Sequence, residues 1–279
     1  MDSELSLLHL PGLCCKAFGG NSDDAIPVSA AWYLMQRASH LLDAIEDGDN
    51  LDNLLIKFNE SQILNLSTGL IFTAESILNG LEINYGIKSK KAIDIRMAFS
   101  QQILKMIDGQ HLDLSIHIPN LDEAWEIAKN KSGEFFSLVC YAGGRLGTNN
   151  KKNLESLTEY GNILGVIIQI ADDLDGILNN QGGSDIVAGK WGLPAIYSYN
   201  SDFKSQELKS YMEEAAINTE SFNKAREIII NSGAVIYLIL EVQRYKYSAE
   251  KAIEYLQKEN EMIELTTILN NVSQVCHEK

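Results

Sequence analysis

Prolines are few and far apart in this chain, which constrains its fold more than any other feature. The 279 residues contain only four prolines, and none occurs between Pro27 and Pro119. Proline interrupts helices because it lacks an amide hydrogen and its ring clashes with the preceding turn, so long stretches without it favour long helices. In these stretches apolar residues recur every three or four positions, most clearly in residues 51–70, 93–112 and 160–170. The last of these is apolar on most sides, so it is expected to form a central helix. Sustained period-two alternation is absent, so the sequence predicts an all-α protein.

Short polar or glycine-containing segments separate the helical stretches. They have the composition of loops rather than of interdomain linkers. The expected breaks fall at residues 19–22, 85–86, 117–120, 147–150, 179–184 and 199–201. The sequence has no low-complexity segment and no repeat of fixed period. We therefore expect about ten helices in a single domain, residues 1–279.

The formal net charge of −15 limits the classes of partner. Nucleic acids and anionic lipid surfaces need a basic footprint, so neither is expected to bind. An acidic protein that binds an anionic substrate needs local cations or metal ions at the site. The four cysteines match no zinc or redox spacing, and the N-terminus lacks the basic region of a signal peptide. With no apolar run of ~20 residues, we expect a cytoplasmic protein without stable membrane insertion.

Acidic residues at helical spacing form two candidate sites. Asp43 and Asp47 are four residues apart, which places both carboxylates on one helix face, with Glu46 beside them.

The second acidic set follows the apolar run that ends at Ile170. It consists of Asp172, Asp173 and Asp175, and carboxylates at the end of a buried helix need a compensating interaction. Paired carboxylates can act as acid and base, or they can hold magnesium together with substrate phosphate. A solvated helix end is the alternative for the first set, and spacing alone does not decide between these interpretations.

The residues around both acidic sets resemble the polyprenyl synthetase family, the trans-isoprenyl diphosphate synthases. Five segments match in the family's order: Ala38-Ser39 before Asp43, Gly109-Gln110-His111-Leu112-Asp113, Lys131-Ser132-Gly133, Gly161 to Asp173, and Gly182 to Pro194. The resemblance implies a bundle of long antiparallel helices around a deep apolar cavity, the isoprenoid synthase-like fold. It also implies a homodimer that uses Mg²⁺ to bind a prenyl diphosphate.

The same resemblance assigns roles to individual residues. It implies catalytic metal-binding carboxylates at Asp43, Asp47, Asp172 and Asp173, with Glu46 and Asp175 as further metal ligands. It implies diphosphate contacts from Lys131, Lys190 and Gln169. The small residues Ala38 and Ser39 imply a deep pocket, which favours a C15 or C20 chain. For the lysines a solvated position is the alternative, and Gln169 can instead support a polar neighbour.

The sequence departs from the family at both acidic motifs and at the second substrate site. Ala44 replaces the middle aspartate of the first motif, and Gly176 takes the last place of the second. Chain-elongating members carry Lys and Arg near the N-terminus to bind isopentenyl diphosphate, where this chain has residues 8–11 without a cation. Residues 48–53, after the first motif, also lack the family's arginines. Neutral residues cannot replace bidentate arginine contacts to phosphate, so the isopentenyl diphosphate site is expected to be missing.

Three functions fit this combination. Retained metal ligands without a second diphosphate site predict terpene synthase-like chemistry, in which an allylic prenyl diphosphate ionises and the cation cyclises, loses a proton or captures water. The second is a chain-elongating prenyltransferase that binds isopentenyl diphosphate by other residues. The third is a non-catalytic subunit of a heteromeric prenyl synthase, against which the retained Asp43, Asp47, Asp172, Lys131 and Lys190 argue.

Overall fold

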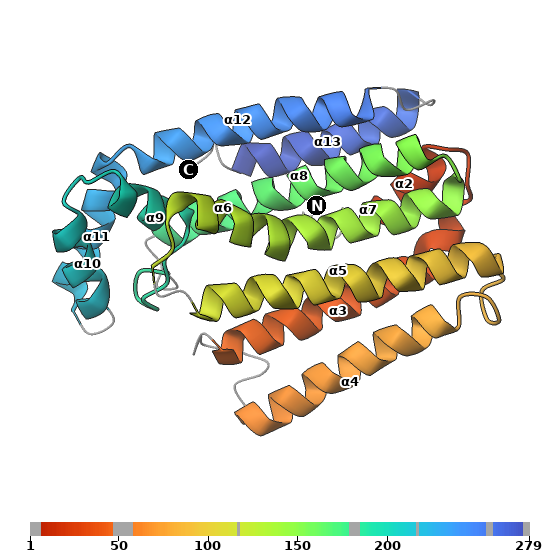
Figure 1. Cartoon of the computed structure of the whole chain (residues 1–279), viewed down its shortest axis with the longest axis horizontal. Helices are drawn as coiled ribbons and strands as arrows, with labels where there is room; N and C mark the ends of the chain where they lie inside the picture. Colours follow the sequence, from red (N-terminus) through yellow and green to blue (C-terminus); the bar gives the residue numbers. More distant parts are fainter. Residues whose placement is uncertain are drawn as a thin grey trace. The chain divides into compact units, whose positions relative to one another are not determined.

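The computed structural model describes residues 7–46, 58–115, 118–178, 185–215, 218–254 and 259–275. These residues are helical throughout, with short connections and no β-strand among them (Figure 1). The prediction of an all-α fold is confirmed. The helices are α2 (Leu10–Lys16), η1 (Ser22–Ala25), α3 (Ile26–Glu46), α4 (Glu60–Asn79), α5 (Ser89–Ser115), α6 (Leu121–Ala128), η2 (Lys129–Gly133), α7 (Glu134–Gly147), α8 (Lys151–Leu178), α9 (Leu193–Asn200), α10 (Ser205–Glu214), α11 (Thr219–Asn231), α12 (Ala234–Ile253) and α13 (Glu259–Val275).

Several helices begin at asparagines that cap them. Asn59 and Asn120 each form a reciprocal capping box, with Gln62 and Glu123 respectively, which satisfies amide groups of the first turn. Asn218 caps α11 in a similar way, through one side-chain oxygen.

The breaks predicted at 147–150 and 199–201 coincide with helix ends, and the break at 85–86 lies in the connection between α4 and α5. The break predicted at residues 179–184 lies outside the described residues, as do residues 51–57 of the apolar pattern predicted over 51–70.

The chain divides into two compact units. The first unit comprises residues 1–101, 138–158 and 255–265, and the second comprises residues 102–137, 159–254 and 266–279. The expectation of one domain over residues 1–279 stays a prediction.

In the first unit α3 packs along α4, as Figure 1 shows. Helix α2 packs closely on α7, where two glycines leave room for its backbone. A Cβ added at Gly143 would lie 2.2 Å from the carbonyl oxygen of Pro11, and one at Gly147 would lie 2.3 Å from that of Cys15. No larger residue fits either position without moving α2.

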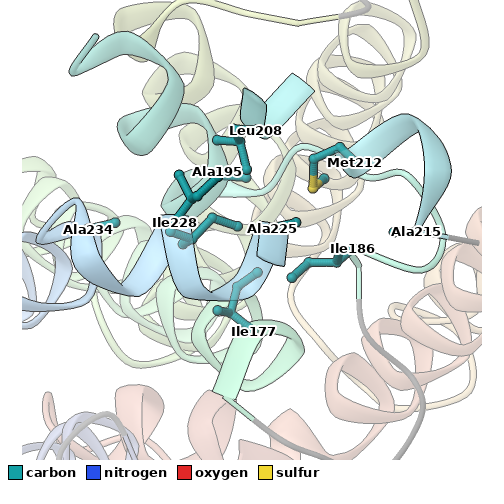
Figure 2. Packing of buried hydrophobic residues seen from close by; sticks show 10 residues of the cluster. Ile177, Ile186, Ala195, Leu208, Met212, Ala215, Ala225, Ile228 and Ala234 are labelled. Carbon is teal, nitrogen blue, oxygen red and sulfur yellow. The ribbon is translucent and has the colours of Figure 1, made fainter. Parts of the chain in front are cut away.

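In the second unit, α8 is apolar on most sides between Tyr160 and Ile170, as the sequence predicts for a central helix. A hydrophobic cluster next to its C-terminal end joins it to α9, α10 and α11. Figure 2 shows this cluster of Ile177, Ile186, Ala195, Leu208, Met212, Ala215, Ala225, Ile228, Ile229 and Ala234. Arg226 of α11 extends this contact, because its Nε and Nη2 donate to the carbonyl oxygens of Ile177 and Leu178, each at 2.8 Å. The last turn of α8 is thereby held by packing and by charged donors.

Within the described ranges, no helix is long and apolar enough to span a membrane.

Candidate active site

The C-terminal end of α8 carries three carboxylates in three different environments. Asp172 is exposed, Asp175 is half-buried, and Asp173 is 7% exposed. Asp173 lies three residues after Ile170 and four before Ile177, so it shares their buried face, while Asp172 points about 100° away. Asp172 therefore faces solvent, whereas Asp173 needs partners inside the protein.

Both oxygens of Asp173 accept hydrogen bonds from the protein. Oδ1 accepts from Gln169 Nε2 at 2.7 Å, and Oδ2 accepts from the backbone N–H of Leu193 at 2.8 Å. Gln169 Oε1 in turn accepts from the Ser132 hydroxyl at 2.6 Å. We call Ser132, Gln169, Asp173 and Leu193 the Asp173 network; it connects η2, α8 and the first turn of α9.

Glycines allow these segments to approach each other. A Cβ added at Gly165 of α8 would lie 2.2 Å from the carbonyl oxygen of Ser132. A Cβ at Gly133 would lie 2.7 Å from Asn162 Nδ2, and one at Gly192 would lie 3.3 Å from Asp173 Oδ2. The close contact between α8 and the π-turn η2 therefore depends on glycine at positions 133 and 165, where a larger residue would collide with the facing segment.

Burial, with a smaller contribution from the negative charge of Asp185, raises the pKa of Asp173 to about 7. The hydrogen bonds from Leu193 and Gln169 act in the opposite direction, because they stabilise the ionised form.

The two lysines predicted to contact diphosphate lie on segments that the Asp173 network connects. Lys131 is part of the π-turn η2, a distortion that often marks functional sites in helices. Its Nζ forms an ion pair with Asp113 Oδ2 at 2.7 Å. Lys190 is half-buried just before α9, and its backbone N–H donates to the carbonyl oxygen of Asp185 at 2.7 Å.

Gly176 takes the place of the last aspartate in the second motif, and the carboxylate of Asp185 lies against it. A Cβ added at Gly176 would lie 2.5 Å from Asp185 Oδ2, so the Asp185 carboxylate covers this glycine. Asp185 comes from the segment after α8, and the spacing of the motif in the sequence gives no signal of this contact.

The first acidic set lies at the end of α3. Asp43 is half-buried and Glu46 is exposed, while Asp47 lies outside the described residues. One helical turn earlier, Ala38 is 1% exposed and Ser39 is half-buried. The pocket role of these two small residues stays a prediction.

The carboxylates of α8 suit magnesium shared with a phosphate ligand better than a metal cage built by the protein. Across the described ranges, no three His, Cys, Asp or Glu side chains come together in a metal-binding group. Magnesium does not require one, because it keeps several waters and is typically held by one or two carboxylates plus phosphate oxygens. The exposed Asp172 and the half-buried Asp175 are donors of this kind, whereas Asp173 is buried and accepts from Gln169 and Leu193.

The family model for polyprenyl synthetase matches residues 10–229. The chain belongs to the polyprenyl synthetase family. It is therefore an isoprenoid diphosphate enzyme, as the resemblance in the sequence predicts.

Individual relatives cover nearly the whole chain. It is 28% identical over 274 residues to the tryptophan prenyltransferase ComQ of Bacillus subtilis, covering 94% of this chain and 84% of that protein. It is 22% identical over 266 residues to a geranylgeranyl diphosphate synthase of Methanosarcina mazei, covering 91% and 76%. Among solved structures, a polyprenyl synthase from Caulobacter crescentus in complex with calcium and isoprenyl diphosphate has a TM-score of 0.84 and 20% identity, covering 98% and 85%. The last likeness establishes the isoprenoid synthase fold.

Proposed function

We propose that this enzyme uses Mg²⁺ to ionise an allylic prenyl diphosphate of C15 to C20 length and does not condense it with isopentenyl diphosphate. The observation that carries the proposal is a segment without lysine or arginine where chain-elongating members have these cations. Leu8 is half-buried, His9 is exposed at the start of α2, and Leu10 is fully buried. None of the three provides the charged donors that a second diphosphate needs.

In the proposed reaction the carboxylates hold metal and the lysines hold phosphate. Asp43, Asp47 and Asp172 bind Mg²⁺, with Glu46 and Asp175 as further ligands. The bound metal neutralises charge on the diphosphate as the carbon–oxygen bond breaks.

Lys131 and Lys190 donate hydrogen bonds to the diphosphate oxygens, and for Lys131 this means exchanging its ion pair with Asp113. The diphosphate leaves with the electron pair of the broken bond, and an allylic cation remains.

We propose the indole ring of a tryptophan as the acceptor of this cation. Support comes from the relative named tryptophan prenyltransferase, which matches almost the full length of both proteins. A new carbon–carbon or carbon–nitrogen bond forms to the ring, and the ring then loses a proton. Terpene synthase-like cyclisation, proton loss or water capture is the second candidate, because it follows equally from the missing cations.

One incubation series tests these functions. The purified enzyme is incubated with Mg²⁺ and allylic diphosphates of each length, with and without isopentenyl diphosphate or tryptophan-containing peptides, and the products are identified by mass spectrometry. Prenylated peptide supports the first candidate, and a hydrocarbon or alcohol from the allylic substrate alone supports the second. Longer prenyl diphosphates mean chain elongation and overturn the proposal, as does an inert protein, which leaves the non-catalytic subunit. Asp172→Ala is expected to abolish product formation.

The homodimer implied by the resemblance has support on α5. Leu104, Ile107 and Leu114 are 61%, 57% and 52% exposed, and with His111 they follow the alternating three- and four-residue spacing of a helix-packing face. We propose that a second copy covers this face.

Light scattering after size-exclusion chromatography tests the dimer. The wild-type enzyme is expected to elute as a dimer. Leu104→Glu places a charge on the exposed face and is expected to shift it to monomer. Glu155→Lys, an exposed charge change elsewhere, serves as the control and should leave the dimer intact; a monomeric wild-type enzyme contradicts the proposal.

A further inference from the structure

Asp173 is adjacent to the exposed Asp172, but its contacts are of a different kind. We infer that Asp173 is a positioning residue that fixes the Gln169 amide and the segments bearing Lys131 and Lys190, and that it is not a metal ligand. The inference deepens the proposed function and rests on it for its catalytic consequence.

The chemistry of the partners sets the orientation of the Gln169 amide. The –NH₂ end of the Gln169 amide donates to Asp173 Oδ1 at 2.7 Å, which is the orientation that the carboxylate form requires because it has no hydrogen to donate. The amide oxygen is then directed at the Ser132 hydroxyl at 2.6 Å. Without Asp173 nothing in this network distinguishes the two ends of the amide.

The burial of Asp173 argues against a metal on its carboxylate. The side chain is 7% exposed, and each oxygen already has a donor. A metal that displaced either donor would leave the Gln169 amide or the Leu193 N–H without its partner, and an unsatisfied buried donor is costly. A metal on the second lone pair of either oxygen would have to lie in the protein interior, where Mg²⁺ loses the waters that it normally keeps. Asp172, on the same turn, is exposed to solvent.

The segments that the network connects carry the two lysines. Ser132 follows Lys131 directly in the π-turn, and Leu193 lies three residues after Lys190. One carboxylate thus ties both phosphate-binding segments to the helix that bears the metal ligand. Misplacement of a reacting group by ~1 Å can lower a rate by about 100-fold, so loss of the tie is expected to affect turnover.

The first test compares Asp173→Asn with Asp172→Asn. Asparagine has one acceptor oxygen and one donor, so Asp173→Asn either leaves a donor unpaired or turns the Gln169 amide, with its –NH₂ end toward Ser132. Either outcome changes the position of the amide and is expected to lower kcat by about 10-fold to 100-fold. The half-saturating Mg²⁺ concentration should stay within about twofold of wild type, since no ligand is lost. Asp172→Asn should instead raise it strongly. Calorimetry with Mg²⁺ and inorganic pyrophosphate gives a readout without turnover: Asp173→Asn retains binding, and a loss equal to that of Asp172→Asn overturns the inference.

The second test exchanges the two side-chain chemistries by combining Gln169→Glu with Asp173→Asn. The new amide at position 173 donates to the new carboxylate at position 169, and its oxygen accepts from the Leu193 N–H. The carboxylate at position 169 also accepts from the Ser132 hydroxyl, so all three hydrogen bonds and the net charge are restored. Each single variant is expected to lower the melting temperature and to speed hydrogen exchange at the Leu193 amide, and the double variant should recover both. Additive losses in the double variant overturn the inference.

The two proposals fail separately. If the wild-type enzyme releases diphosphate from no allylic substrate, the proposed function is wrong. Melting temperature and hydrogen exchange need no substrate, so the double variant still decides whether Asp173 holds the network together.

Discussion

Arg145 is a buried cation near the end of α7, 4% exposed, and every described contact of its guanidinium satisfies a neighbouring polar group. Its Nε and Nη2 both lie 2.9 Å from Asp94 Oδ2, and its Nη1 donates to the Thr148 carbonyl oxygen and to Asn149 Oδ1. Arg145→Leu is expected to lower the free energy of unfolding by about 2–4 kcal/mol, because three acceptors lose a charged donor. Urea denaturation measures this loss.

Lys151 offers a matched control for Arg145. Its side chain is 90% exposed and pairs with Glu155 at 3.4 Å, four residues along the same helix. Such a surface pair contributes little, so Lys151→Leu should change the free energy of unfolding by less than about 0.5 kcal/mol. Equal losses in the two variants would show that the burial of Arg145 has no energetic consequence.

The cysteines near α2 and α7 are expected to be unreactive in the folded protein. Cys14, Cys15 and Cys140 are all 0% exposed, and burial raises the pKa of Cys15 to about 11. The attacking species is the thiolate, whose fraction at pH 8 is very small for such a thiol. Cys276 lies outside the described residues, so it is replaced by serine for this measurement. We expect labelling by a disulfide reagent at pH 8 to be at least about 100-fold slower in native than in denatured Cys276→Ser protein; fast labelling of one thiol would contradict the buried positions.

At the scale of helices, two glycines in different surroundings are expected to respond to alanine in opposite ways. Gly165→Ala places a Cβ 2.2 Å from the Ser132 carbonyl oxygen and 2.9 Å from Gly133 Cα. Because both obstacles are backbone atoms, the π-turn has to move, and a loss of about 1–3 kcal/mol in unfolding free energy is expected. The movement also separates Ser132 from Gln169, so binding of Mg²⁺ and pyrophosphate should weaken.

Gly69 is the matched control in the middle of α4. A Cβ there meets nothing within 4 Å. Alanine in a helix interior is more favourable than glycine by about 0.5–1 kcal/mol, so Gly69→Ala is expected to stabilise the protein. Thermal and urea unfolding of both variants should give changes of opposite sign, and the same sign in both would refute the close contact at Gly165.

Helical periodicity predicts which residues share a face but not what covers that face. In α8 the run from Tyr160 to Ile170 is predicted to be central and is buried, and the same period places Asp173 on the buried face. In α5 the apolar residues Leu104 and Ile107 follow an equally good pattern and are exposed. The difference depends on neighbouring helices, which a local pattern does not encode.

Other features that the sequence does not predict depend on contacts between residues far apart in the chain. The aspartate motif suggests equal roles for Asp172 and Asp173, yet Leu193, twenty residues later, gives Asp173 its second partner. Asp185 lies against Gly176, where the family has an aspartate in the motif itself. The two carbonyl groups at the end of α8 meet Arg226, which is nearly 50 residues away and matches no motif.

At the scale of the whole molecule, the net charge of −15 makes ligand binding depend on the metal. Pyrophosphate alone meets a repulsive field and exposed carboxylates, and magnesium alone has no phosphate oxygens to complete its ligand set. We therefore expect neither to change the melting temperature appreciably. Together they should raise it by several degrees, since a ligand at about 100 times its Kd adds about 2.7 kcal/mol to folding stability.

Two variants of α8 test whether this rise in melting temperature depends on the candidate metal site. Asp172→Asn removes the exposed carboxylate at the candidate metal site and should abolish most of the shift. Glu155→Gln removes an exposed carboxylate from the first turns of the same helix, where its side chain is 63% exposed, and should leave the shift intact. Excess EDTA should reverse the shift in the wild-type enzyme. A shift with pyrophosphate alone, or an undiminished shift in Asp172→Asn, would mean that the phosphate site does not depend on a metal held by this residue.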